Sequence, residues 1–360
     1  MTRSIRDFDW TLILTCLLLS GIGVLQIYSA TAGTRFSDAW WKQIVFVSVG
    51  LLLMWMVAWI DYHSLLGQVP VLYLASIAGL ILVLLIGTRI YGARRWITVF
   101  GFMFQMSEFV KLVLILMVAR FLTDVRVDTL ELADFLKLSG LIGIPFLLVA
   151  KQPDLGTALT YLPILATGAF LAGLRWKYIV VIGLVIVVIL PAVWLTLKDY
   201  QRARLVTFVN PDADPRGSGY QLIQSRIAVG SGGMWGRGVT KGTQTKYQFL
   251  PVPHTDFILA SFAEEHGFVG VVGVLTLYFI LLMQIVQNAQ TATDRAGMYI
   301  CTGVSALLLF HIFVNVAMVV GNAPVTGIPL PLMSAGGSNT ISTFVMLGLV
   351  NNVRLRRFVN

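Results

Sequence analysis

The sequence predicts an all-α, polytopic integral membrane protein with about ten transmembrane helices. Hydrophobic residues make up 57% of the 360 residues and charged residues only 12%, and the mean hydropathy is +0.82. That charged fraction is about half of what a soluble domain carries. The apolar residues also gather into runs of about 20, the length that crosses a bilayer as a helix.

The apolar runs follow one another along the whole chain. The fifth run is short and only residues 151–154 separate it from the sixth, which favours a tight outside turn over a re-entrant pair. Pro191 predicts a kink near the outer end of the seventh run. The eighth run is long enough to project from the bilayer. The expected spans lie near 10–29, 41–60, 69–88, 106–122, 138–150, 155–174, 178–197, 257–287, 297–320 and 339–353.

One long polar segment, about 198–255, separates the seventh and eighth runs. No soluble domain or repeat is visible, so we expect residues 1–360 to form a single transmembrane domain with this segment as a large extracytoplasmic loop. Cys16 and Cys301 lie inside apolar runs, which argues against a disulfide framework or a thiolate metal site.

The distribution of Lys and Arg predicts that both termini are cytoplasmic. An even number of spans places both ends on one side, and on that assignment the short inside segments carry eleven cations and the short outside segments six. The inside cations are Arg3, Arg6, Arg120, Arg126, Lys137, Arg175, Lys177, Arg295, Arg354, Arg356 and Arg357, and the outside cations are Arg35, Lys42, Arg89, Arg94, Arg95 and Lys151. The long loop adds eight more outside, which we interpret as a functional feature.

The stretch Phe249–Gly273 places a carboxylate, Asp256, at the mouth of a membrane helix. A charged group there loses hydration, so Asp256 is a candidate functional residue. The alternative is a plain helix N-cap. On a straight helix Glu264 lies about 12 Å further along the axis, and Glu265 faces the other way. These acids therefore do not form the close pair of a two-carboxylate glycosidase.

Two cationic stretches on the predicted outer face suit phosphate binding. Arg94 and Arg95 precede Trp96, and they are either interfacial anchors or a phosphate clamp. Next along the chain, Glu108 and Lys111 are three residues apart on one helix face, which predicts an internal ion pair.

Residues 151–158 contain a second cation near an acid. Asp154 suits the cap of the following helix. Lys151 either pairs with Asp154 or contributes directly near substrate phosphates.

The long loop combines positive charge with glycine. Its run 220–228 has apolar residues at helical spacing, and the glycine-dense 230–238 segment would let backbone N–H groups approach an anion. Eight cations, including Arg202 and Arg216, against three acids favour an anionic ligand.

The segment 325–339 breaks the helical pattern before the last span. Pro329 and Pro331 end the helix, and 336–338, with Ser338, offers a flexible entry to the next. Non-helical backbone at this depth lines a cavity or is buried in protein. His311 and Asn315, four residues apart on the ninth span, are expected to be interhelical hydrogen-bond partners.

These stretches together resemble the SEDS family of bacterial cell-wall proteins, also called the RodA/FtsW family. The similarity is ordered along the chain from the third span to the last. The matching segments are Arg94–Trp96, Ser107–Glu108 with Lys111, Gln152–Thr157, Tyr220–Gln221, Gln224–Ser225, Gly230–Gly233, Trp235–Gly236, Gly242–Gln244, Leu250–Pro251, His254–Phe257, Glu264–Glu265, Gly327–Pro331 and Gly336–Ser338. Met106 and Ala335 depart from the family pattern, which has proline and tyrosine there. The short segment before the first span favours the RodA branch.

The resemblance implies an inverting peptidoglycan glycosyltransferase that polymerises lipid II at the outer face of the bacterial cytoplasmic membrane. Asp256 would be the general base, with Glu108, Asp154, Glu264 and Ser338 in supporting roles. The candidates for binding the substrate pyrophosphate are Arg94, Arg95, Lys111, Lys151, Arg202 and Arg216. The resemblance also implies a class B penicillin-binding transpeptidase as partner, and a divalent cation is a further candidate at the pyrophosphate.

Two other functions fit the same sequence features. A lipid II transporter would use the same basic cavity without a chemical step. A scaffold that only recruits a partner would not need Asp256.

Overall fold

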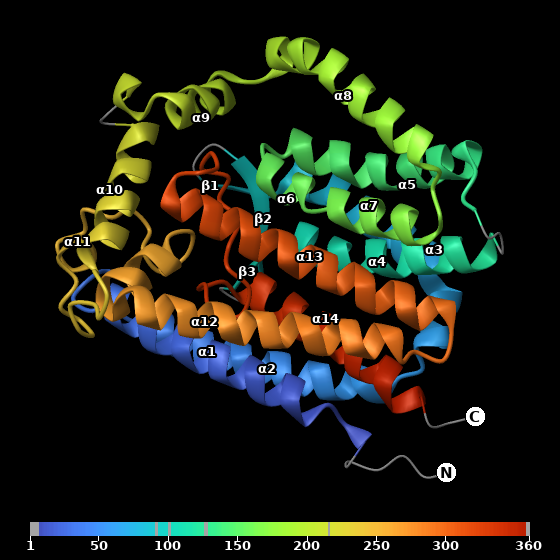
Figure 1. The fold of residues 1–360 in the computed structure, drawn as a ribbon, viewed down its shortest axis with the longest axis horizontal. Helices are drawn as coiled ribbons and strands as arrows, with labels where there is room; N and C mark the ends of the chain where they lie inside the picture. The colour runs from blue at the N-terminus through green and yellow to red at the C-terminus, as the bar shows by residue number, and fades with distance from the viewer. Residues whose placement is uncertain (1–6, 91–92, 100–101, 126–128, 215–216, 358–360) are drawn as a thin grey trace.

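The computed structural model describes residues 7–90, 93–99, 102–125, 129–214 and 217–357, and these residues are mainly helical (Figure 1). The helices are α1 (Trp10–Thr31), α2 (Ala39–Trp59), α3 (Tyr62–Ile86), α4 (Met106–Asp124), α5 (Leu132–Lys151), α6 (Leu155–Leu159), α7 (Leu162–Leu171), α8 (Trp176–Thr196), α9 (Asp199–Val209), α10 (Ser218–Ser231), α11 (Thr243–Lys246), α12 (Ile258–Gln290), α13 (Arg295–Val320) and α14 (Gly337–Arg356). A 3-10 helix, η2, spans Pro211–Ala213.

The predicted apolar runs all coincide with helices. Within the described ranges, six helices are long and apolar enough to cross a membrane: α1, α2, α3, α5, α12 and α13. The sixth predicted run is divided into α6 and α7, with Pro163 in the first turn of α7. The polytopic all-α prediction is therefore confirmed, and the count of ten spans stays a prediction.

The last helix, α14, lies at the centre of the bundle and packs against α2, α4, α12 and α13 (Figure 1). Small residues allow this close packing. A Cβ placed on Gly348 would lie 2.7 Å from the Met54 carbonyl oxygen of α2, and one on Gly50 would lie 2.6 Å from the Phe344 ring. The helix is less apolar than its neighbours, and most of its residues are buried.

A small antiparallel sheet follows α3, and the sequence analysis did not predict it. Its strands β1 (Thr88–Ile90), β2 (Ala93–Val99) and β3 (Phe102–Phe104) pair in the order β1-β2-β3. Residues 96–99 are aromatic or β-branched, a composition that favours a strand. The sheet connects the end of α3 to the start of α4, and its strand β2 contains Arg94 and Arg95.

The polar segment 198–255 is folded into α9, η2, α10 and α11, and α10 includes the predicted helical run 220–228. Both termini lie at one end of the bundle, and α10 and α11 lie at the opposite end (Figure 1). That arrangement agrees with an even number of passes.

At a kink in α12, part of the long loop packs against the helix and hydrogen-bonds to it. Gly267 has φ +67°, and a Cβ there would lie 2.3 Å from the Gly236 nitrogen, so only glycine fits. The Arg237 and Gly238 N–H groups donate to the carbonyls of Glu264 and Glu265, at 3.0 and 2.9 Å. The prediction that the 230–238 segment offers its N–H groups to an anion is therefore wrong for Arg237 and Gly238, which bind α12.

Candidate active site

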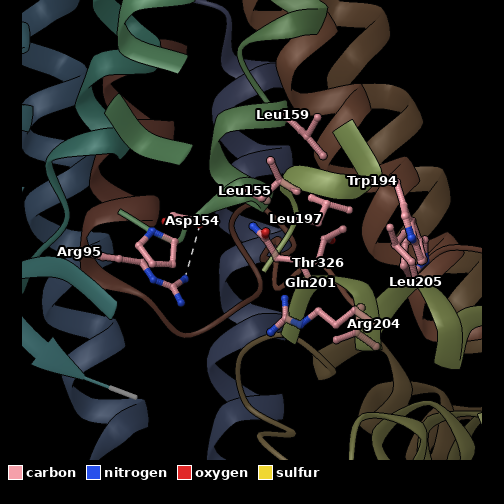
Figure 2. Close-up of a pocket in the computed structure, with 14 residues that line it drawn as sticks. Arg95, Asp154, Leu155, Leu159, Trp194, Leu197, Gln201, Arg204, Leu205 and Thr326 are labelled. Carbon is pink, nitrogen blue, oxygen red and sulfur yellow. Dashed lines mark ion pairs between the residues drawn. The ribbon is translucent and has the colours of Figure 1, made fainter. Parts of the chain in front are cut away.

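A cavity of about 250 Å³ lies where α6, the end of α8 and α9 meet the segment 324–326. Figure 2 shows its polar groups, Arg95, Asp154, Gln201 and Arg204, beside an apolar wall. The wall consists of Pro153, Leu155, Gly156, Leu159, Trp194, Leu197, Leu205, Pro324 and Val325, and Thr326 also contributes to the lining. The cavity therefore suits a ligand with an apolar part joined to an anionic part.

Asp154 is fixed at the polar side of this cavity. Its carboxylate caps α6 by accepting from the Thr157 N–H at 3.3 Å, as predicted. It also accepts from Gln105 Nε2 at 2.9 Å and pairs with Arg95 at 3.5 Å. The partner of Asp154 is thus Arg95, and the predicted alternative of a pair with Lys151 is wrong.

Asp256 lies just before α12, and its role differs from that of an N-cap. The helix begins at Ile258 and its N-cap is Phe257, without a capping side chain. The cap interpretation of Asp256 is therefore wrong, since the residue stands one position too early. Its carboxylate borders the segment that lines the cavity, because a Cβ on Gly327 would lie 3.5 Å from Asp256 Oδ2.

Hydrogen bonds from two other segments hold the backbone around Asp256. Asn315 of α13 donates through Nδ2 to the Asp256 carbonyl at 3.0 Å and to the Ile328 carbonyl at 2.8 Å. Ser334 Oγ donates to the Thr255 carbonyl at 2.7 Å. The position of the carboxylate thus depends on α13 and on the proline-rich segment before α14.

Electrostatics around Asp256 match those of a proton acceptor. Burial raises the pKa of its carboxyl above the ordinary range, and the positive charges of Arg204 and Arg95 partly oppose this rise in pKa. The negative charge of Asp154 raises it further. The charges of Arg95, Arg204 and Asp154 therefore all act on the Asp256 carboxyl group.

The structure does not bring the other predicted cations to the lining of this cavity. Arg94 donates to the Leu84 and Leu85 carbonyls at the end of α3. Arg202 donates to carbonyls at the end of α8. Lys151 is exposed at the end of α5. Arg216 lies outside the described residues.

Lys111 is buried inside the bundle as half of the predicted ion pair. Its Nζ lies 2.8 Å from Glu108 Oε2, and the two side chains are only 1% and 4% exposed. His311 Nε2 lies 3.4 Å from the same ammonium group, and Ser342 Oγ lies 3.5 Å from Glu108. The arrangement neutralises both charges within the apolar interior.

The remaining supporting residues connect distant segments. Glu264 is fully buried and accepts from the backbone N–H groups of Gln244 and Thr245 at 2.9 and 3.2 Å, so it fastens α11 to α12. Ser338 Oγ accepts from the Gln105 N–H at 2.9 Å and thereby joins the start of α14 to the start of α4.

Sequence reasoning missed Arg204 as a site residue and missed the contact of Asn315 with Asp256. Arg204 is one of three cations within seven residues of a polar loop, and no local pattern separates it from Arg202. Asn315 was recognised as a hydrogen-bonding residue, but its partner comes from a segment 59 residues away. Among the described residues, no group of three or more His, Cys, Asp and Glu side chains is arranged to hold a metal ion.

Comparisons with known proteins identify the family of this chain. The profile of the FtsW/RodA/SpoVE family, described as cell cycle proteins, matches residues 9–357. Peptidoglycan glycosyltransferase MrdB of Escherichia coli is 38% identical over 351 residues, covering 97% of this chain and 94% of its own. Peptidoglycan glycosyltransferase RodA of Treponema pallidum is 33% identical over 430 residues and covers 99% of each chain.

Solved structures give the same result. A chain of a peptidoglycan synthase complex superposes with a TM-score of 0.85 at 34% identity, covering 98% of this chain and 99% of its own. RodA of Thermus thermophilus superposes with a TM-score of 0.73 at 30% identity, covering 98% of both chains. An aspartate-to-alanine variant of that RodA superposes with a TM-score of 0.74. The chain therefore belongs to the FtsW/RodA/SpoVE family of cell cycle proteins, the SEDS family that its motifs predicted.

Proposed function

We propose that this chain is a peptidoglycan glycosyltransferase that polymerises lipid II into glycan strands for cell elongation and shape. The observation that carries the proposal is the cavity, in which an apolar wall meets two arginines close to a carboxyl group of raised pKa. Lipid II has matching parts: a polyprenyl tail, a pyrophosphate and a disaccharide. Relatives named peptidoglycan glycosyltransferases align over almost the whole chain, which supports the same reaction here.

Asp256 acts as the general base in this proposal. It takes the proton from the 4-hydroxyl of the acceptor sugar while that oxygen attacks the anomeric carbon of the donor. The bond from the anomeric carbon to the pyrophosphate oxygen breaks, and the pyrophosphate leaves with the electron pair. Direct displacement inverts the anomeric centre. A raised pKa suits this step, because a more basic carboxylate accepts the proton more readily.

Arg95 and Arg204 stabilise the pyrophosphate leaving group. Both line the cavity, and the planar guanidinium binds phosphate oxygens through two parallel hydrogen bonds. Asp154 orients Arg95 through their 3.5 Å ion pair. A divalent cation is a further candidate for assisting the same leaving group.

The chain is a multi-pass protein of the bacterial inner membrane, and we propose that residues 1–360 form one transmembrane domain with the segment 198–255 outside. The excess of Lys and Arg in the short segments at the terminus end supports cytoplasmic termini. We also propose a single-pass class B penicillin-binding transpeptidase as partner. The similarity to a chain of a peptidoglycan synthase complex supports a partner in cell-wall synthesis.

The test uses purified protein and labelled lipid II, with products separated on a gel. Asp256→Asn keeps the shape of the side chain and removes the base, so polymerisation should fall by about 100-fold or more while lipid II binding persists. Asp134→Asn, at the far end of α5, is the matched control and should polymerise normally. Full polymerisation by Asp256→Asn would refute the assigned base. Transport of lipid II without any polymer from the unmodified protein would favour the transporter instead.

A further inference from the structure

A pair of exposed aromatic rings lies on the loop that leads to Asp256. Tyr247 and Phe249 are 63% and 47% exposed, and their ring centroids are 6.2 Å apart. They directly follow α11, which lies at the end of the bundle opposite the two termini (Figure 1). The catalytic proposal uses neither ring.

The loop presents these rings in a fixed conformation. Glu264 anchors α11 on one side, and the Leu250 N–H donates to the Gln244 carbonyl at 3.0 Å on the other. Leu250 itself is buried, which anchors the end of this turn. The two rings flank the turn residue Gln248. The turn residue Gln248 has φ +58°, a left-handed conformation that is uncommon outside glycine.

A second strained residue lies nearer to Asp256. Val252 has φ +47°, which is an outlier for a β-branched side chain, and it is 46% exposed. Such residues persist where the surrounding structure enforces them, and they cluster at functional sites. Beyond Val252, the His254 ring contacts the Phe36 ring in a tilted arrangement, with the ring centroids 5.0 Å apart.

Charge identifies the kind of molecule that this surface fits. Residues 217–255 contain no Asp or Glu, and the exposed Lys246 directly precedes Tyr247. Of the other cations in this range, Arg226 and Arg237 donate to the carbonyls of Gly321 and Ser231. Sugar rings stack their apolar C–H faces on aromatic side chains, and the peptides attached to a peptidoglycan strand carry carboxylates. An anionic glycan therefore matches both the rings and the charge.

We propose that Tyr247 and Phe249 form a subsite for the growing glycan strand as it leaves the reaction centre. Phe249 is seven residues before Asp256, so at most about 25 Å of chain separates them, a reach of a few sugar units. The subsite rests on the proposed polymerase function and adds retention of the strand between additions. It differs from a contact with lipid headgroups, which needs no fixed ring geometry and which the rings at helix ends, such as Trp40 and Trp41, can provide.

The test measures two quantities on the purified full-length protein with lipid II: the rate of lipid II consumption and the length of the strands at low conversion. For Tyr247→Ala/Phe249→Ala we expect strands several-fold shorter, with consumption within about twofold of the unmodified protein. Tyr247→Phe/Phe249→Tyr keeps both rings and should restore strand length. Phe170→Ala removes an equally exposed ring from α7 and should change neither quantity.

Tyr247→Leu/Phe249→Leu separates the glycan from the membrane as occupant. Leucines preserve apolar contact with lipid but cannot stack on a sugar ring, so this variant should resemble the alanine pair. Strands of normal length from the alanine or leucine pair would overturn the subsite, as would a parallel loss of consumption. If the unmodified protein made no polymer at all, the proposed function would fail instead.

Discussion

The buried pair Glu108–Lys111 allows one prediction that decides between two roles for Lys111. At 2.8 Å and an effective dielectric constant near 20, two unit charges attract by about 6 kcal/mol. The desolvation of both groups offsets much of this attraction, yet removing one partner leaves the other charge buried and costs about 3–5 kcal/mol. Glu108→Gln and Lys111→Met should therefore each destabilise the protein strongly.

The double variant Glu108→Gln/Lys111→Met should recover most of that loss, because neither charge remains. At about 2 °C per kcal/mol for a large chain, each single variant should melt roughly 6–10 °C below the unmodified protein. The double variant should melt close to it. Thermal unfolding in detergent gives these values, and a lipid II polymerisation assay on the same samples gives the activity, which we expect within about tenfold of normal.

The exposed pair Asp134–Lys137 is the matched control. It has the same three-residue spacing and a separation of 2.9 Å, but its side chains are 20% and 67% exposed. Breaking it should cost less than about 1 kcal/mol. A double variant of the buried pair that melts normally but makes no polymer would show that the charged pair is needed for the reaction as well as for stability. Single variants as stable as the unmodified protein would refute the electrostatic reasoning itself.

Three further predictions concern the site and its support. Because the Asp256 base must be deprotonated, activity should fall as the pH drops through its raised pKa. Arg204→Gln removes a positive charge that lowers this pKa, so the acid limb of the kcat/KM profile should move to higher pH. An acid limb that does not move would show that Arg204 does not influence the titration of Asp256. Asn315→Leu leaves the buried Ile328 carbonyl without this donor, at about 1–3 kcal/mol, and also frees the partly buried Asp256 carbonyl. The variant should slow single-turnover polymerisation while lipid II binding holds, and an unchanged rate would contradict the positioning role of Asn315. Gly267→Ala should lower the melting temperature and speed proteolysis of the long loop. Gly273→Ala places its Cβ where nothing lies within 4 Å and should be neutral. Equal melting temperatures for the two variants would contradict the requirement for glycine at the kink.

Local patterns in the sequence predicted much of this molecule. Apolar runs located the helices, because membrane helices must bury their backbone groups within one continuous segment. The three-residue spacing of Glu108 and Lys111 predicted their ion pair, and the position of Asp154 before an apolar run predicted its cap.

The errors came from contacts that join distant segments. Arg94 and Arg202 are as cationic as Arg95 and Arg204, yet the first two bind carbonyls at helix ends and the last two line the cavity. Which arginine reaches the cavity depends on how α9 and β2 approach α6, and no local pattern encodes that. The N-cap interpretation of Asp256 failed for a smaller reason, because the helix begins one residue later than an N-cap at Asp256 requires.

The kink at Gly267 has a consequence for how the protein fits its membrane. It divides α12 into a short part before Gly267, fastened to the long loop and adjoining Asp256, and a long apolar part that continues to Gln290. Transmembrane helices tilt to match the thickness of the surrounding bilayer. We therefore expect the apolar part of α12 to adapt its tilt at the kink while the short part stays fastened to the loop. Variation in lipid composition should then have little effect on the geometry around Asp256.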